Sequence, residues 1–116
     1  MANYFSRKEL ECKCCGVCII DDEFLSMLNK AREYANIAFV VNSAYRCKKH
    51  NEKIGGSPTS SHLKSCAVDL KAETSSKKFI ILNALLKAGF SRIGIGSTFI
   101  HVDSDKTKPQ NVIWTY

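Results

Sequence analysis

Apolar residues recur at helical spacing in two long segments of this sequence, and this periodicity limits the possible folds more than any other feature. The segments run over residues 22–35 and 75–88, behind cap candidates at positions 21–22 and 75–76. Each segment is therefore predicted to be an amphipathic helix that buries one face. The repeating residues are Phe24, Met27 or Leu28, Ala31, and Tyr34 or Ala35 in the first segment, and Phe79, Leu82, Leu85 and Leu86 in the second.

Shorter segments between and after the helices have the apolar or alternating pattern of strands. Residues 37–42 (IAFVVN) are apolar and β-branched, and residues 67–72 (AVDLKA) alternate. Residues 92–97 and 99–103 predict a hairpin, and residues 114–116 are expected to close the sheet. A short helix and a loop of turn formers, GGSPTSS, separate the first two strands. These elements predict a single α+β domain over all 116 residues, with a mainly antiparallel sheet flanked by helices.

The charge and the apolar content exclude some classes of protein. No apolar run approaches the roughly 20 residues that a membrane span needs, so no membrane span is expected. The formal net charge of +6 favours polyanionic partners, but the lysines and arginines are scattered along the chain. The sequence contains no arginine-rich tract and no aromatic-interleaved RNA motif. A nucleic-acid partner is therefore not expected.

Six cysteines are many for a chain of this length, and most of them lie in a cysteine-rich lead-in over residues 1–20. Two alternatives exist for the lead-in cysteines: a structural zinc site, with or without Cys47, or thiols that bind no metal. Four thiolates from one seven-residue loop fit a tetrahedron poorly, so the sequence favours thiols without a second metal. Cys66 is interpreted as a packing residue. The lead-in cysteines are Cys12, Cys14, Cys15 and Cys18.

Two of the three histidines stand where they suit a metal ion. His62 follows the turn-rich loop, and Asp69 lies seven residues later on a predicted strand. His101 lies on another predicted strand with apolar flanks. Imidazole and carboxylate are normal zinc ligands, and three protein ligands with an open fourth position are typical of a catalytic zinc. Spacing alone also allows a strand histidine to be a core residue, and His50 is interpreted as structural or exposed.

The motifs around these residues resemble those of a known family. SSHLKSCAVDL, residues 60–70, resembles the Ser-x-His-x-x-Gly-x-Ala-x-Asp signature of the zinc D-alanyl-D-alanine carboxypeptidases. That family includes dipeptidases, cell-wall endopeptidases and phage endolysins, and the Hedgehog signalling domain shares its fold. VNSAYRCKKHN and GFSRIGIGSTFIHVD resemble two further family segments, and FSRKELECKCCG and WTY resemble the two ends of its short, phage-type members.

The resemblance implies a Hedgehog/DD-peptidase-like fold and a zinc metallopeptidase. It implies that His62, Asp69 and His101 hold one Zn²⁺ and that a zinc-activated water attacks an amide. Arg46 matches the family arginine that approaches the substrate, where its guanidinium suits a terminal carboxylate or a developing oxyanion. Ser60 matches the motif serine, which either donates a hydrogen bond to substrate or orients the neighbouring histidine.

The sequence departs from the family pattern at two positions. Ser65 replaces the motif glycine, which removes easy access to positive φ. Thr98 stands three residues before the last histidine ligand, where many members carry a residue able to take a proton. Asp103 is the nearest carboxylate candidate, because residues two apart on a strand share a face and place it beside His101. We expect it to act as the catalytic base, with orientation of a ligand as the alternative.

These observations predict a peptidase that hydrolyses a D-amino-acid-containing peptide of bacterial peptidoglycan, as a carboxypeptidase or an endopeptidase. The alternative is a non-catalytic, zinc-containing wall-binding or virion structural module, which the threonine at the usual base position favours. A nucleic-acid-binding domain built on the cysteines and the charge is a further alternative. The start, MANYFSRKELECK, has no apolar segment, so a product made in the cytoplasm and delivered to the cell wall by a lysis system or a virus particle is expected. We expect a monomer.

Overall fold

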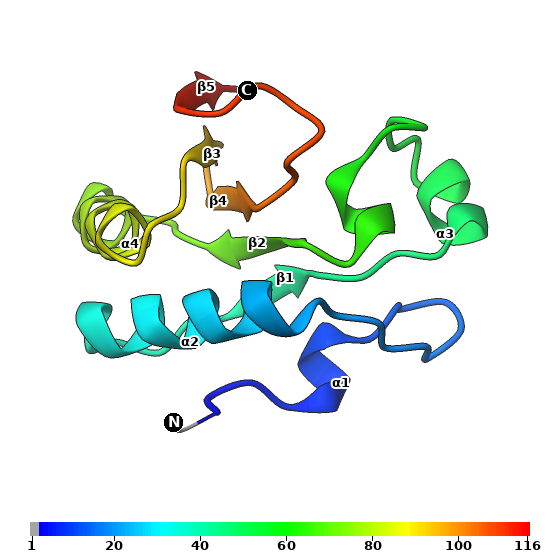
Figure 1. The fold of residues 1–116 in the computed structure, drawn as a ribbon, viewed down its shortest axis with the longest axis horizontal. Helices are drawn as coiled ribbons and strands as arrows, with labels where there is room; N and C mark the ends of the chain where they lie inside the picture. The colour runs from blue at the N-terminus through cyan, green and yellow to red at the C-terminus, as the bar shows by residue number, and fades with distance from the viewer. Residues whose placement is uncertain (1–2) are drawn as a thin grey trace.

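Five strands form one sheet in the computed structural model, which describes residues 3–116 (Figure 1). The strand order is β1-β2-β4-β3-β5, and neighbouring strands are antiparallel except for the parallel pair β3 and β5. The α+β class with a mainly antiparallel sheet is thus confirmed. The strands are β1 (Val41–Ser43), β2 (Ala67–Lys71), β3 (Arg92–Ile95), β4 (Phe99–Asp103) and β5 (Val112–Thr115).

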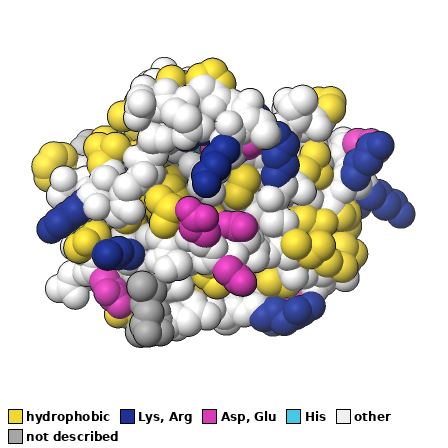
Figure 2. Space-filling view, viewed as in Figure 1, with side chains coloured by type: hydrophobic (Ala, Val, Ile, Leu, Met, Phe, Trp, Pro, Cys, Tyr) yellow, Lys and Arg dark blue, Asp and Glu magenta, His cyan; other side chains and the backbone are white. Residues whose placement is uncertain are grey.

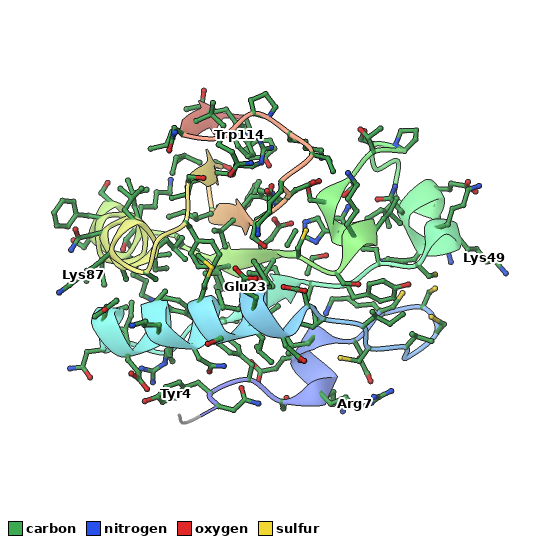
Figure 3. All side chains as sticks on the ribbon, in the orientation of Figure 1. Tyr4, Arg7, Glu23, Lys49, Lys87 and Trp114 are labelled. Carbon is green, nitrogen blue, oxygen red and sulfur yellow. The ribbon has the colours of Figure 1, made fainter. Side chains whose placement is uncertain are left out.

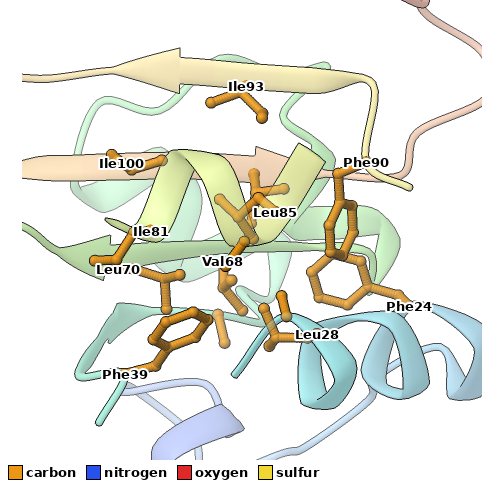
Figure 4. Close-up of a cluster of buried hydrophobic side chains, with 14 of the residues drawn as sticks. Phe24, Leu28, Phe39, Val68, Leu70, Ile81, Leu85, Phe90, Ile93 and Ile100 are labelled. Carbon is orange, nitrogen blue, oxygen red and sulfur yellow. The ribbon is translucent and has the colours of Figure 1, made fainter. Parts of the chain in front are cut away.

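Two long helices pack against one face of this sheet and against each other (Figures 1 and 4). They are α2 (Asp22–Ala35) and α4 (Ser75–Lys87), close to the bounds that periodicity predicts. Shorter helical segments lie in the connections: α1 (Arg7–Leu10), α3 (Lys48–Lys53) and the 3₁₀ turn η1 (Ser61–Lys64). Among residues 3–116, no helix has the length and hydropathy needed to cross a membrane.

Strand alternation decides which side chains enter the core. Val68 and Leu70 of β2 and Ile100 of β4 lie on the side of the sheet that the helices cover (Figure 4). Val102 of β4 shares the face of Ile100, and all four side chains are fully buried in the core. Burial of each such side chain contributes roughly 1.5–3 kcal/mol relative to exposure. The residues between them on each strand must therefore project from the opposite face, which the long helices leave free for polar side chains.

The predicted apolar face of the second long helix is partly wrong. The buried residues of α4 are Ile81, Ala84 and Leu85, whereas the side chains of Phe79 and Leu86 are 71% and 49% exposed. This helix is apolar nearly all round (FIILNALL), so its pattern does not single out one face.

The predicted caps are confirmed in one helix and shifted in the other. Asp21 caps α2 through a hydrogen bond from the Phe24 amide to its carboxylate, at 2.9 Å. In α4 the N-cap is Thr74, one residue before the predicted serines, and its hydroxyl accepts from the amide of Lys77. Both threonine and serine favour this position, so the sequence alone does not choose between them.

The first predicted strand is also shorter than expected. Of residues 37–42, only the last two join β1, and a register irregularity lies within it. The preceding residues still serve the core and the sheet, because Phe39 is buried and the Val40 carbonyl accepts from the amide of Lys71. An apolar, β-branched run predicts burial here more reliably than ladder pairing.

The cysteine-rich lead-in is anchored by a short helix. A capping box between Ser6 and Glu9 begins α1, and the apolar side chains of Phe5 and Leu10 enter the core. Residues 1–2 of the predicted lead-in lie outside the described part of the chain. The anchor fixes the loop that follows, which carries the lead-in cysteines.

Candidate metal centre and active site

Two of the predicted ligands lie side by side on neighbouring strands. Asp69 of β2 pairs with His101 of β4, and both project from the face opposite the long helices. The Asp69 Oδ1 atom lies 2.9 Å from His101 Nδ1 and 3.3 Å from His62 Nε2. The structure therefore brings together the three residues that the sequence nominates, with their donor atoms all within 4.8 Å of one another.

The turn η1 places His62 beside Asp69 and His101. His62 is buried, and its Nδ1 atom donates to the carbonyl oxygen of Ala44 at 2.6 Å. That bond fixes the ring and leaves Nε2 free toward Asp69. Ser60 caps the turn by accepting a hydrogen bond from the His62 amide, and Ser65 ends it at φ +66°. The motif glycine position is thus left-handed here, as its identity in the family suggests.

His101 is held from its other side. Its Nε2 atom lies 2.7 Å from Asp103 Oδ2, so Nδ1 is the nitrogen that faces Asp69. The ring of Trp114 in β5 packs beside it, with centroids 5.6 Å apart. This packing needs glycine at position 94 between them, because a Cβ there would overlap the indole. Both histidine rings are therefore oriented by partners that do not compete for a metal ion.

The donor set fits a divalent cation. Two imidazole nitrogens and one carboxylate oxygen direct lone pairs toward one small region, an arrangement that a cation or a shared proton stabilises. Burial acts to raise the pKa of Asp69, but hydrogen bonds and charges from His101 and His62 outweigh it and hold that pKa well below the usual range. Asp69 is consequently an anion at neutral pH, the form in which a carboxylate can hold a metal ion.

The same carboxylates act on the imidazole. Burial lowers the pKa of His101, but the hydrogen bonds and charges of Asp103 and Asp69 raise it above the ordinary histidine value. Two carboxylates around one ring favour a positive charge at this place. A metal ion supplies that charge in place of the proton, so acid is expected to release it.

Asp103 lies behind the ligand rather than in front of it. Its side chain is 1% exposed, and one oxygen accepts from Arg92 Nε at 2.7 Å and from the Asp105 amide at 3.0 Å. The other oxygen faces His101 Nε2. The structure confirms that Asp103 shares the face of His101, and these contacts match the orienting alternative, in which the carboxylate fixes the ring of a ligand.

Arg46, in the segment after β1, reaches the candidate metal ligands His62, Asp69 and His101. Its Nη2 atom lies 3.6 Å from Asp69 Oδ2, while Nε donates to Ser43 Oγ at 3.2 Å and Nη1 donates to Asn51 Oδ1 at 3.1 Å. Neutral partners thus hold two corners of the guanidinium. The arginine lines the same cleft as the ligands, where a substrate carboxylate or oxyanion can reach it.

The cleft above the ligands has a volume of about 390 Å³. A hollow of about 440 Å³ lies elsewhere, beside α2, and contains neither His62 nor His101. The lining of the 390 Å³ cleft includes three aromatic side chains and two cations that sequence reasoning did not nominate: Phe99, Trp114, Tyr116, Arg92 and Lys108.

Comparison with known families shows which kind of protein carries these residues. The family model for peptidase M15 matches residues 3–103, which include His62, Asp69, His101 and Arg46. The chain belongs to the peptidase M15 family. M15 peptidases are zinc-dependent, so the converging donors are a candidate zinc centre of a metallopeptidase. No curated protein matches the chain.

Other nominated residues of this M15 peptidase lie outside the cleft. Thr98 is in the turn between β3 and β4, where its carbonyl accepts from the Ala72 amide. His50 lies on α3 and lines a separate hollow with Cys14, Cys15 and Cys47. One residue in the sequence could have indicated the aromatic wall of the cleft. It is Gly94 of β3, which pairs with His101 on one side and Trp114 on the other.

Proposed function

We propose that this M15 peptidase hydrolyses a peptide bond in bacterial peptidoglycan, within a peptide that contains D-amino acids. The observation that carries the proposal is the convergence of His62, Asp69 and His101 at the floor of an open cleft, with Arg46 beside them. Carboxypeptidase and endopeptidase activities differ only in whether the substrate presents a terminal carboxylate near the arginine.

Zinc would be held by His62 Nε2, His101 Nδ1 and a carboxylate oxygen of Asp69. Bound zinc supplies Lewis acidity and lowers the pKa of water toward about 7. The protein contributes the orientation of the donors, because the Ala44 carbonyl and the Asp103 carboxylate each fix one imidazole from behind.

Arg46 would bind the negative charge of the substrate. Its guanidinium presents a rigid fork of donors, which suits the planar carboxylate of a peptide end or the oxygen of a scissile carbonyl as charge develops on it. Ser43 and Asn51 hold the guanidinium before substrate arrives, so little orientation remains to be fixed on binding.

The surface charge suits an acidic polymer such as a cell wall. The net charge is +6, and on the face shown in Figure 2 the lysines and arginines are spread around the molecule rather than gathered in one patch. Such a distribution favours weak, non-specific attraction to a polyanion over a defined nucleic-acid groove. Delivery to the wall by a lysis system or a virus particle remains part of the proposal.

A second candidate function has one observation in its favour. Thr98 replaces the usual proton acceptor, and the described carboxylates that line the cleft, Asp69 and Asp103, both contact His101. A chain that binds zinc and wall peptide without hydrolysis would have this appearance.

Digestion of purified sacculi, followed by mass spectrometry of the released peptides, tests the proposal. The wild-type protein is expected to release peptides or D-alanine, and R46K is expected to lower the rate by roughly one to three orders of magnitude with zinc retained. Arg32→Lys, at the far end of α2, is the matched control and should keep the wild-type rate. No release by the wild-type protein from any wall preparation would favour the binding module.

A further inference from the structure

The thiol cluster, which we define as Cys12, Cys14, Cys15 and Cys47, lies at the junction of the lead-in loop and α3. Its four sulfur atoms are within 4.8 Å of one another. Sulfur atoms gather beside the loop that follows α1, on the side of the molecule that carries Lys49 (Figure 3). The objection from the sequence to a metal site here is that four thiolates from one seven-residue loop fit a tetrahedron poorly. The structure removes that objection, because Cys47 comes from a segment 33 residues beyond Cys14.

We propose that the thiol cluster binds a structural zinc ion, separate from the catalytic centre. Zinc–sulfur bonds of about 2.3 Å in a tetrahedron place the sulfur atoms about 3.8 Å apart. The observed separations are 3.6 Å between Cys12 and Cys14 and 3.3 Å between Cys14 and Cys47. Both are far beyond the roughly 2.05 Å of a disulfide bond. A small contraction and expansion of the cluster would centre a zinc ion among the four thiolates.

The backbone around the cluster already supplies hydrogen bonds that stabilise thiolates. The amide of Cys47 donates to Cys12 Sγ, and the amide of His50 donates to Cys47 Sγ, both at 3.4 Å. The loop itself is closed by a hydrogen bond from the Gly16 amide to the Cys12 carbonyl, with Gly16 at φ +71°. The thiolate is the form of cysteine that binds metal, and the two amide donors favour that form at Cys12 and Cys47.

The surroundings of the thiol cluster suit a zinc–thiolate group, which is negatively charged as a whole. Four thiolates around one zinc carry a net charge of −2, and Lys49 and Lys53 of α3 line the same hollow. His50 also lines it, and its Nδ1 atom is buried with no hydrogen-bond partner among the described residues. An unpartnered buried nitrogen beside clustered thiols is a further sign that a group is bound at this place.

Cys18 and Cys66 do not belong to the site. Both pack against the hydrophobic core, Cys66 as a buried residue and Cys18 as a half-buried one. The lead-in thus divides its cysteines between two roles. Three of them, the buried Cys12 and the exposed Cys14 and Cys15, gather around Cys47, and the fourth faces the core.

The proposed zinc would fasten the segment that carries Arg46. Cys47 follows Arg46 directly, and the preceding residue, Tyr45, donates its amide to the Leu10 carbonyl of α1. A metal joining the lead-in to Cys47 would limit movement of this segment at one end, and the hydrogen bond from the Arg46 amide to the His62 carbonyl limits it at the other. The inference requires no activity and stands apart from the proposed function.

Metal analysis of protein purified with reductant, without chelator and from zinc-supplemented culture tests the inference. We expect about two zinc ions per chain in the wild type, about one in Cys47→Ser, about one in His101→Ala and about none in the double variant. Cys18→Ser is the matched control, since it removes a cysteine of the same loop outside the cluster, and should retain about two. Serine is a good N-cap, so Cys47→Ser should preserve the start of α3.

Two further measurements on the unaltered chain keep the test independent of folding in the variants. Substitution with Co²⁺ should give the intense visible absorption of tetrahedral thiolate ligation, and alkylation of the native protein should spare the cluster until a chelator is added. Any of three results would overturn the inference: about one zinc in the wild type, a Cys14–Cys47 disulfide in freshly purified protein, or a second zinc that persists in Cys47→Ser. Loss of the second zinc alone leaves the peptidase proposal intact, and loss of the catalytic zinc alone leaves this one intact.

Discussion

The histidine centre and the thiol cluster place their ligands by different means. In the first, Asp69 and His101 stand opposite each other on paired strands, and side-chain alternation projects both from one face. In the second, three ligands come from one turn and the fourth from the end of an irregular segment. Paired strands hold these side chains in place because the other face of the same strands is packed in the hydrophobic core. A turn fixes them only as well as its own few hydrogen bonds allow.

The two sites also differ in how they tolerate the absence of metal. In each histidine, the ring nitrogen that points away from Asp69 has a hydrogen-bond partner, which is the Ala44 carbonyl for His62 and the Asp103 carboxylate for His101. Each ring is therefore expected to keep its orientation without a bound metal ion. In the thiol cluster, backbone amides donate to Cys12 and Cys47, but a hydrogen bond with Cys47, together with burial, raises the pKa of the Cys14 thiol to about 12. Full ionisation of neighbouring thiols needs a cation among them. The histidine centre is therefore expected to be preorganised, and the thiol cluster to depend on its metal.

The largest expected effect comes from removing a histidine ligand. His62→Ala or His101→Ala should abolish binding of the catalytic zinc and lower turnover by at least about four orders of magnitude, since the pKa of water returns from about 7 toward 15.7 without the metal. Circular dichroism should still report the wild-type fold, because the core lies on the opposite face of the sheet. Retention of full zinc content in both variants would contradict the assignment.

Replacement of Asp103 by asparagine tests how the histidine centre is preorganised. Asparagine keeps the size but cannot hold the ring of His101 as a carboxylate does. If Asp103 orients the ligand, zinc affinity and turnover should fall together by about 10- to 100-fold. If Asp103 is the base, turnover should fall by about two to four orders of magnitude with zinc affinity unchanged. Asp22→Asn, on the exposed start of α2, is the matched control. Paired measurements of zinc affinity and rate separate the two roles.

Removal of metal should affect the two regions unequally. Under a strong chelator, hydrogen exchange is expected to speed up by at least about tenfold at the amides of Cys12, Gly16 and Cys47, which bond within or beside the thiol cluster. The amides of Lys71 and Ala72, next to the histidine centre, should keep their protection because they bond within the sheet region. Equal loosening of both regions would contradict the contrast between a preorganised centre and a metal-dependent one.

The residues of the histidine centre were nominated by the family resemblance, and the local strand pattern accounts for why two of them lie together. Alternation within residues 67–72 and 99–103 is enough to put Asp69 and His101 on the face away from the core, and burial of the opposite face restricts the register in which β2 and β4 pair. For the thiol cluster the sequence left the participation of Cys47 open and favoured thiols without metal, since nothing in the pattern says which segment returns to the lead-in. The role of Arg92 was missed for a similar reason, because its bond to Asp103 depends on register between strands.

Asp105 stabilises the turn that carries His62, and this stabilisation is expected to depend on pH. Asp105 accepts from Ser61 Oγ at 2.9 Å and pairs with Lys64 at 3.1 Å. Burial acts to raise the pKa of Asp105, but bonds from Thr107, Ser61 and Lys64 outweigh it and hold that pKa far below its usual range. Because the folded pKa is the lower one, the unfolded chain binds more protons in acid. The stabilisation is full above about pH 4 and is lost as the pH falls below that value.

Asp105→Asn should therefore lower the free energy of unfolding by about 1 kcal/mol at pH 7 and by less at pH 3. Urea midpoints at the two pH values give the comparison, and the exposed Asp22→Asn serves again as the matched variant. A loss of stability that is the same at both pH values would show that the carboxylate charge is not what holds this turn.

The smallest expected effect lies at the end of the same turn and measures how far its backbone is strained. Ser65 is left-handed at φ +66°, a conformation that costs a non-glycine residue roughly 1 kcal/mol, and glycine avoids that cost. Glycine also has more freedom in the unfolded chain, so Ser65→Gly should raise the free energy of unfolding by only about 0.5 kcal/mol. The reverse change at Gly55, which has φ +74° and open space where a Cβ would stand, should lower it by a similar amount. Opposite shifts in the urea midpoints of Ser65→Gly and Gly55→Ser, with zinc content unchanged, would show that backbone conformation alone is responsible. A loss of stability in Ser65→Gly would instead mean that the serine side chain supports the turn, and that this chain has replaced the family glycine with a contact of its own.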